Sequence, residues 1–168
     1  DSANNSVVVD TTNLNKITKF DKVKGLITCE SGVSINEINK IIIPNGWFMP
    51  VTPGSSYITI GGAVASDVHG KNHHLEGTFS NHILFVDLML SDGEIITISS
   101  TLNSELFQAT CGGMGLTGII ISVTFRLKPI NSNMIKQTTI KTNSLEELFQ
   151  EYEENTLSPY SVAWIDLK

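Results

Sequence analysis

The sequence has no long apolar run, and none approaches the roughly 18 residues that a membrane-spanning helix needs. Basic residues are also scarce: 11 Lys and Arg against 17 Asp and Glu give a net charge of −6. This balance argues against a nucleic-acid partner, because nucleic-acid binding needs a basic surface. The only two cysteines, Cys29 and Cys111, are too few for a disulfide-built scaffold. We expect both to be reduced and inert, as in a cytoplasmic protein, and we see no signal peptide after Asp1.

The most informative stretch runs over residues 53–74, PGSSYITIGGAVASDVHGKNHH. Glycine lets a backbone approach a ligand closely, and successive outward N–H groups form an anion-binding concavity. Residues 61–68 predict a short helix that opens on a glycine pair, and the start of such a helix adds its positive dipole end. We interpret the stretch as a cradle for a phosphate-bearing cofactor. A glycine-rich turn beside a surface histidine cluster would have the same spacing.

The rest of residues 1–130 predicts an α+β domain with a mostly antiparallel sheet and flanking helices. Residues 119–127 alternate apolar and polar side chains, which is typical of an antiparallel strand with one wet face. Ser34 and Glu37 match a capping box at the start of an isoleucine-rich helix. Further strands are expected over 6–10, 25–30, 81–90 and 94–99, and a short helix over 104–110. At 40% hydrophobic residues, the chain can bury a sizeable core.

Residues 131–168 predict the start of a second domain. A strand over 134–141, a helix that begins at a capping box of Ser144 and Glu147, and a strand over 160–167 would form a β-α-β unit. Such a unit cannot bury both of its faces alone. We therefore expect an incomplete second domain, with a boundary near residues 129–133.

Two motifs connect the chain to a known family. PGSSYITIGGAVASDVHGKNHHLEGTFSNH and the later ELFQATCGGMGLTGII resemble the FAD-linked oxidases of the vanillyl-alcohol oxidase superfamily, which have a PCMH-type FAD-binding domain. The HGKNHH run is most similar to the flavin subunits of sugar-lipid epimerases. The resemblance implies an FAD-dependent oxidoreductase that oxidises a secondary alcohol of a sugar, polyol or polyprenyl-phosphoryl sugar by hydride transfer to flavin.

The same resemblance implies how the domains are divided. Residues 1–130 would be the second half of the FAD-binding domain, with Asp1-Ser2-Ala3 just after the missing pyrophosphate loop. Residues 131–168 would begin the cap domain, so this fragment alone would be inactive. Non-covalent FAD, a reductase partner from an epimerase pair, and a cytoplasmic location, peripheral to the inner membrane, would follow.

The resemblance also assigns site residues. The cofactor contacts would fall on Gly54, Thr59, Ile60, Gly61, Gly62, Ser66, Asp67, Val68, His69 and Ile120. Gly113, Gly115 and Gly118 would let the second glycine-rich loop run along the adenosine or ribose, and Ile120 would offer its backbone to adenine. His69, Gly70 and Lys71 would lie on the substrate side. Lys71 either pairs with a substrate phosphate or is a solvated surface lysine.

Two other functions fit parts of the sequence. His69, His73 and His74 have a spacing that can bind zinc on a helix, but Gly70 and Asn72 are poor helix residues, so we expect no metal. A non-enzymatic domain that kept the fold and lost its flavin is the second alternative. We assign no complete catalytic set.

Overall fold

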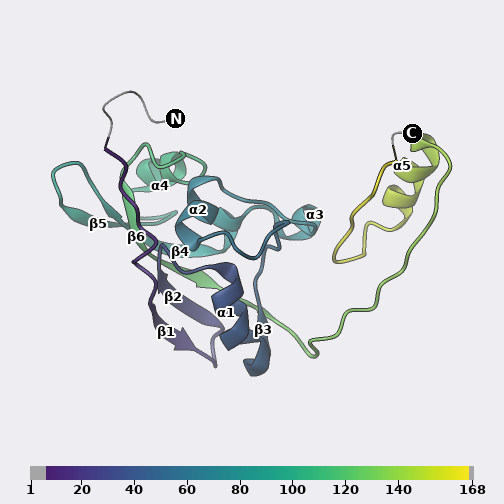
Figure 1. The fold of residues 1–168 in the computed structure, drawn as a ribbon, viewed down its shortest axis with the longest axis horizontal. Helices are drawn as coiled ribbons and strands as arrows, with labels where there is room; N and C mark the ends of the chain where they lie inside the picture. Colours follow the sequence, from purple (N-terminus) through teal and green to yellow (C-terminus); the bar gives the residue numbers. More distant parts are fainter. Residues whose placement is uncertain (1–6, 167–168) are drawn as a thin grey trace.

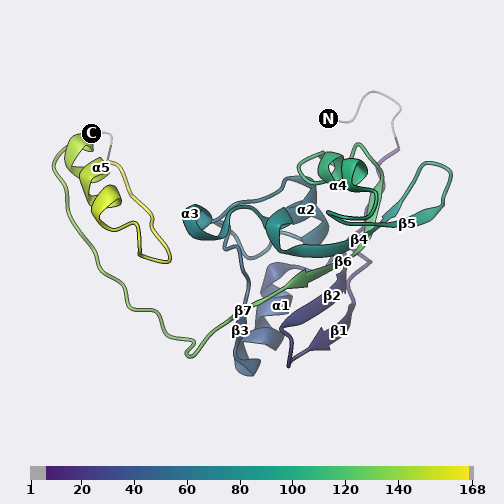
Figure 2. The ribbon, with the colours of Figure 1, turned by 180° about the vertical axis from the view of Figure 1, so that it is seen from behind.

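The computed structural model describes residues 7–166. Its centre is a five-stranded sheet in the order β1-β2-β6-β4-β5, in which all neighbouring strands are antiparallel (Figures 1 and 2). The strands are β1 (Ile17–Asp21), β2 (Leu26–Glu30), β4 (Ile83–Met89), β5 (Ile95–Ile98) and β6 (Ile119–Arg126). Two short strands, β3 (Trp47–Phe48) and β7 (Lys128–Pro129), form a separate pair. This architecture confirms the predicted α+β class with an antiparallel sheet.

One face of the sheet carries the core, and the other is open to solvent, with polar side chains beside the exposed Phe85 and Ile95. Val123 and Phe125 of β6 are fully buried, and the Phe125 ring packs edge-to-face on Phe79 with centroids 5.1 Å apart. On the opposite face, Asp87 accepts hydrogen bonds from the hydroxyls of Ser122 (2.6 Å) and Thr97 (2.8 Å). The period-two alternation therefore predicts the two faces correctly over residues 123–127. It is wrong before them, because a shift in the pairing with β4 turns Ile120 into the core while Ile119 and Ile121 are only partly buried.

The first helix, α1 (Ile35–Ile42), covers the core side with its isoleucines. Its capping box is confirmed, because Ser34 Oγ accepts from the N–H of Glu37 and the Glu37 carboxylate accepts from the N–H of Ser34. The helix continues into a 3-10 turn, η1 (Ile43–Asn45), and ends at Gly46, whose φ of 79° is left-handed.

The remaining helical segments are short. They are α2 (Ile60–Ala65), α3 (His73–Glu76), η2 (Phe79–His82), α4 (Ser104–Thr110) and α5 (Leu145–Glu154). The predicted helix over 61–68 is present but shifted: Thr59 is its N-cap, so the glycine pair lies inside the first turn. The helix has ended before Asp67, whose φ is 39°. Among residues 7–166, no helix is long and apolar enough to cross a membrane.

Several predicted strands are absent, and β1 and the two short strands β3 and β7 were not predicted. Residues 7–10, 134–141 and 160–166 form no strand, because no other segment of the described chain pairs with them. Ser6 and Leu167, at the ends of two of these predictions, lie outside the described residues. β1 was not predicted: its pairing with β2 is interrupted by a bulge between Ile17 and Lys19, which disturbs the alternation.

The segment after β7 has little packing of its own. It runs away from the sheet and returns with α5, so that residues 158–161 lie beside α3 (Figures 1 and 2). The Ser161 N–H donates to the Lys71 carbonyl at 3.0 Å, and the Lys128 ammonium lies 5.9 Å from the centroid of the Tyr160 ring. Division of the chain into two domains near residue 131 stays a prediction.

Candidate functional site

The two glycine-rich segments of the sequence meet at the C-terminal end of α2. The Gly112 N–H donates to the Val64 carbonyl at 3.0 Å, and the Met114 N–H donates to the Ala65 carbonyl at 2.8 Å. These bonds satisfy carbonyls that a helix end leaves unpaired. The loop over 112–118 is therefore fixed against α2, and Ser66 lies next to it, with its hydroxyl 3.9 Å from the Met114 sulfur.

The glycines of these segments differ in what surrounds them. A Cβ at Gly61 would lie 2.8 Å from Ser31 Cβ, and one at Gly70 would lie 2.5 Å from the Thr52 carbonyl oxygen. A Cβ at Gly113 would collide with the backbone oxygen of Ala109, and one at Gly118 would lie 2.5 Å from the backbone oxygen of Met89. These four positions are required by close packing within the chain itself.

Gly54 and Gly115 are the open positions. A Cβ added at either would meet no other atom of the described residues within 4 Å. Gly62 and Ser66, one turn apart on α2, are also exposed. Where the 112–118 loop contacts α2, Gly62, Ser66 and Gly115 therefore present open backbone and small side chains, which fits the close approach of a large planar nucleotide. Gly54 lies at the pocket beside His69.

The start of α2 does not present its donors to solvent. The Ile60 N–H donates to the Val33 carbonyl, and the Gly61 N–H to the Ser31 carbonyl, both at 2.8 Å. The Gly62 N–H donates to Thr59 Oγ1 at 3.2 Å. The expectation of outward N–H groups at this helix start is therefore wrong, because the chain's own acceptors already use them. Any cofactor contact of Thr59, Ile60 or Gly61 would have to use other atoms.

Asp67 and Val68 connect α2 to the next segment. The Asp67 carboxylate accepts from the Ser80 N–H at 2.8 Å and from the Ser80 hydroxyl at 3.0 Å. Val68 accepts from the Phe79 N–H at 2.9 Å. His69 then forms an isolated antiparallel bridge with Thr78. These contacts fix the chain on both sides of the glycine–histidine run.

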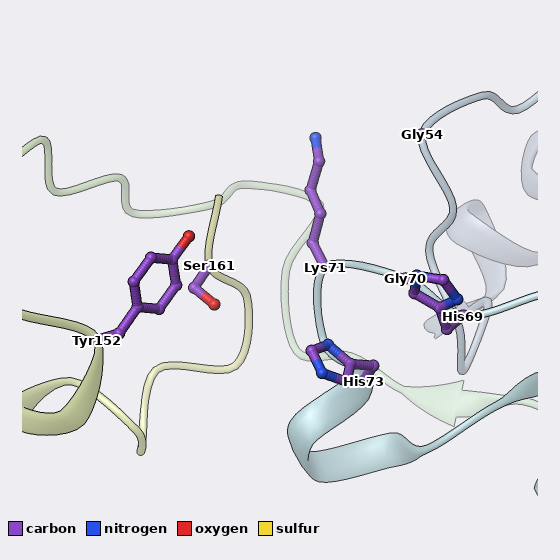
Figure 3. Close-up of a pocket in the computed structure, with 7 residues that line it drawn as sticks. All are labelled: Gly54, His69, Gly70, Lys71, His73, Tyr152 and Ser161. Atoms are coloured by element: carbon purple, nitrogen blue, oxygen red, sulfur yellow. The ribbon is translucent and has the colours of Figure 1, made fainter. Parts of the chain in front are cut away.

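A pocket of about 440 Å³ lies beside that run (Figure 3). Its lining combines the predicted substrate-side residues with residues that the sequence did not indicate. They are Gly54, His69, Gly70, Lys71, His73, Tyr152 and Ser161. In Figure 3 the Tyr152 and Ser161 side chains come from α5 and the segment after it, whereas His69, Lys71 and His73 come from the opposite side. No spacing in the sequence relates these two groups.

The histidines lie near one another without forming a metal centre. The ring centroids of His69 and His73 are 5.9 Å apart, and those of His73 and His74 are 6.0 Å apart. His74 Nε2 is 3.0 Å from the Ser158 carbonyl oxygen. Within residues 7–166, no group of three or more His, Cys, Asp or Glu side chains is arranged to hold a metal ion.

Neither Ile120 nor the two cysteines place a reactive side chain in the site. Ile120 lies opposite Leu88 of β4, beyond the last residue that pairs with β2, and its side chain is buried. Cys29 and Cys111 are free thiols. Burial raises the pKa of each to about 12, so neither is a thiolate near neutral pH.

A comparison with protein families decides what this site belongs to. The model of the family described as "FAD binding domain" matches residues 1–99, more than half of the chain. The chain belongs to this family. The FAD-binding domain is therefore the context in which the two glycine-rich segments are interpreted, and FAD is the cofactor that the family implies.

Individual relatives agree with this assignment. The chain is 36% identical to decaprenylphosphoryl-beta-D-ribose oxidase of Mycolicibacterium smegmatis, over 99% of its own length and 37% of the relative. It is 27% identical to D-lactate dehydrogenase of Anaerostipes hadrus, over 80% of this chain and 29% of the relative. With L-gulonolactone oxidase of Scyliorhinus torazame it shares 30% identity, over 69% of this chain and 26% of the relative. The chain thus spans about a third of the length of these relatives.

Proposed function

We propose that the chain supplies part of the FAD site and part of the substrate pocket of an oxidoreductase acting on a secondary alcohol. The substrate class we propose is a sugar, a polyol or a polyprenyl-phosphoryl sugar. One observation carries the proposal: the loop over 112–118 is hydrogen-bonded onto α2, which places open glycyl backbone from two distant segments on one surface. The name of the relative that is similar along nearly the whole chain supports the sugar-lipid class.

The residues fit FAD in a specific way. Gly54, Gly62 and Gly115 would hold it by leaving room for close contact, and the exposed Ser66 hydroxyl would add a hydrogen-bond donor. Gly113 and Gly118 would act indirectly by shaping the loop, and Ile120 would contribute only backbone. We propose that this binding is non-covalent. When bound, FAD would supply the two-electron oxidising chemistry for conversion of the alcohol to a ketone.

The pocket residues would bind and orient the substrate. Lys71 is exposed at the pocket, where its ammonium can pair with a phosphate group. Tyr152 and Ser161 place hydroxyl groups on the other wall, suited to sugar hydroxyls. We propose that the keto sugar formed by this oxidation passes to a reductase partner.

The test uses the full-length protein that contains this chain. We expect it to purify with bound flavin that denaturation releases, and we expect the yellow colour to bleach when a polyprenyl-phosphoryl ribose is added without oxygen. A protein that stays colourless and does not bind added FAD would contradict the proposal. It would instead support the alternative of a domain that kept the fold and lost its flavin.

Lys71 allows the substrate class to be tested separately. We expect Lys71→Gln to raise KM for a lipid-phosphate sugar about fivefold, because an exposed ion pair contributes up to about 1 kcal/mol. The KM for a sugar without phosphate should not change. Lys40→Gln, at another exposed lysine in the last turn of α1, is the matched control. Equal effects of Lys71→Gln on both substrates would exclude the phosphate contact.

A further inference from the structure

Asn72 is a buried polar residue within the otherwise exposed segment 71–74. It is 0% exposed, whereas Lys71, His73 and His74 on either side are exposed. Asn72 is the N-cap of α3, a position at which an asparagine side chain usually accepts a hydrogen bond from the helix's own N–H groups. Here the side chain bonds elsewhere, so the local structure of α3 does not explain why an amide is buried at this point.

The amide of Asn72 joins two segments of the chain. Its Nδ2 donates to the Pro50 carbonyl at 2.7 Å, and its Oδ1 accepts from the N–H of Thr52 at 3.4 Å and from the Thr52 hydroxyl at 3.3 Å. The Lys71 N–H donates in parallel to the Thr52 carbonyl at 3.3 Å. Three hydrogen bonds offset the cost of burying the amide.

The two joined segments adjoin the residues that form one wall of the pocket in Figure 3, which are Gly54 and His69 to Lys71. Residues 50–52 lead directly into Gly54, and Asn72 directly follows His69, Gly70 and Lys71, all of which line the pocket. Asn72 itself is not part of the lining. We infer that Asn72 is a positioning residue: its amide sets the separation between Gly54 and the His69–Lys71 backbone, and thereby the shape of the pocket. What the pocket binds rests on the proposed function.

The geometry requires one donor and one acceptor on a short side chain. Leucine has a similar volume and offers neither group. A protonated aspartic acid can replace both groups, because its O–H can donate to the Pro50 carbonyl while its other oxygen accepts from Thr52. An ionised aspartate only accepts, and would face the Pro50 oxygen without a proton between them. Burial at this position disfavours the charged carboxylate and raises the pKa of the aspartic acid above its usual value of about 4, so that it is protonated at pH 5. Asn72→Asp should therefore keep the wall intact at low pH and lose it at high pH.

The experiment uses the full-length protein and FAD as the probe. We expect Asn72→Leu to weaken FAD binding about tenfold and to change the visible absorption of the bound flavin, because small misplacements in a positioned site have large effects. Asn72→Asp should bind like the wild type at pH 5 and about tenfold more weakly at pH 8. The wild type, measured at both pH values, is the reference for any effect of the neighbouring ionisable groups, which are His69, Lys71, His73, His74 and Glu76. The matched control is Ser99→Ala, which removes another buried polar group, one that accepts from the Thr101 and Leu102 N–H groups after β5.

The outcomes separate this inference from the proposed function. Wild-type affinity and spectrum in Asn72→Asp at both pH values would overturn the inference, even if Asn72→Leu does not fold. If the wild type itself binds no FAD, the proposed function fails and hydrogen exchange decides the inference. The Lys71 amide should then exchange at least tenfold faster in Asn72→Asp at pH 8 than in the wild type, with no such change in Ser99→Ala. Equal exchange would overturn the inference.

Discussion

At the scale of single residues, Gly54 and Gly61 show two different reasons for a glycine: room for a ligand at Gly54 and close packing within the chain at Gly61. Both belong to the segment that the sequence marks as a cofactor cradle. Gly61 touches Ser31 of the neighbouring strand end, whereas Gly54 is surrounded by open space within the described structure. The same residue type therefore has two different roles, and alanine substitution should give opposite results at the two positions.

Gly61→Ala should destabilise the fold. Its new Cβ would lie 2.8 Å from Ser31 Cβ, and overpacking of this kind costs about 1–3 kcal/mol. The gain in helix propensity, at most about 1 kcal/mol, offsets part of this cost. Urea unfolding should show a net loss of stability. A variant as stable as the wild type would mean that Gly61 is not held against Ser31.

Gly54→Ala should leave the free energy of unfolding unchanged or raise it by up to about 1 kcal/mol, because alanine reduces the freedom of the unfolded chain. Its methyl group should nevertheless weaken FAD binding about tenfold, or 1.4 kcal/mol, in the full-length protein. Isothermal titration measures this change. Unchanged affinity would remove Gly54 from the proposed cofactor surface.

At the scale of elements, the two capping boxes predicted from the sequence begin helices that contribute differently to stability. Ser34 begins α1, whose isoleucines pack in the core. Ser144 begins α5, and its hydroxyl accepts from the Glu147 N–H as predicted. The second half of this box is wrong, because the Glu147 carboxylate accepts from the Asn143 N–H and not from Ser144, and none of residues 145–154 is buried. Loss of the first cap should lower the free energy of unfolding of the whole domain, and loss of the second should leave it unchanged.

Ser34→Ala should lower the free energy of unfolding by about 1 kcal/mol at pH 7. Hydrogen bonds from the Ser34 side chain and backbone lower the pKa of Glu37 below its usual 4.5. The stability that they contribute is therefore fully present above pH 4.5 and is lost as the pH falls through the lowered value. We expect the difference between wild type and variant to shrink between pH 6 and pH 3, measured by urea unfolding. A constant difference would contradict this account, and Ser144→Ala serves as the control.

The elements that the sequence predicted are those set by local signals. The cap, spacing and glycine stop of α1 lie within a few residues of one another, and the alternation over residues 123–127 gives the two faces of β6 directly. The alternation fails at Ile120, because a shift in the pairing with β4 is not visible in the sequence of β6. Strands over 134–141 and 160–166 were expected from composition, but a strand also needs a partner, which the described chain does not supply. Within the site, the glycines were found from sequence, whereas the contact of Gly61 with Ser31 and the burial of Asn72 depend on distant residues.

At the scale of the whole molecule, the segment after β7 carries apolar side chains that the structure leaves exposed. Leu145 and Phe149 of α5 are 53% and 63% exposed. Apolar surface of this kind commonly marks an interface. We propose that a further part of a cap domain covers it in the full-length protein.

This proposal predicts the behaviour of the chain by itself. The double variant Leu145→Ser and Phe149→Ser should reduce binding of a hydrophobic dye such as ANS, without changing the unfolding of the sheet. Val23→Ser, at a single exposed valine in the β1–β2 turn, should have little effect on dye binding. In the full-length protein, the double variant should instead lower the unfolding temperature. Unchanged stability there would show that α5 stays uncovered.

The central claim is that two distant glycine-rich segments form one FAD surface. Hydrogen–deuterium exchange of the full-length protein with and without FAD tests it most directly. The account predicts that FAD slows amide exchange in both segments together, over residues 54–69 and 112–118, with a common dependence on FAD concentration. Binding of FAD with protection of only one segment, or with protection of neither, would contradict it.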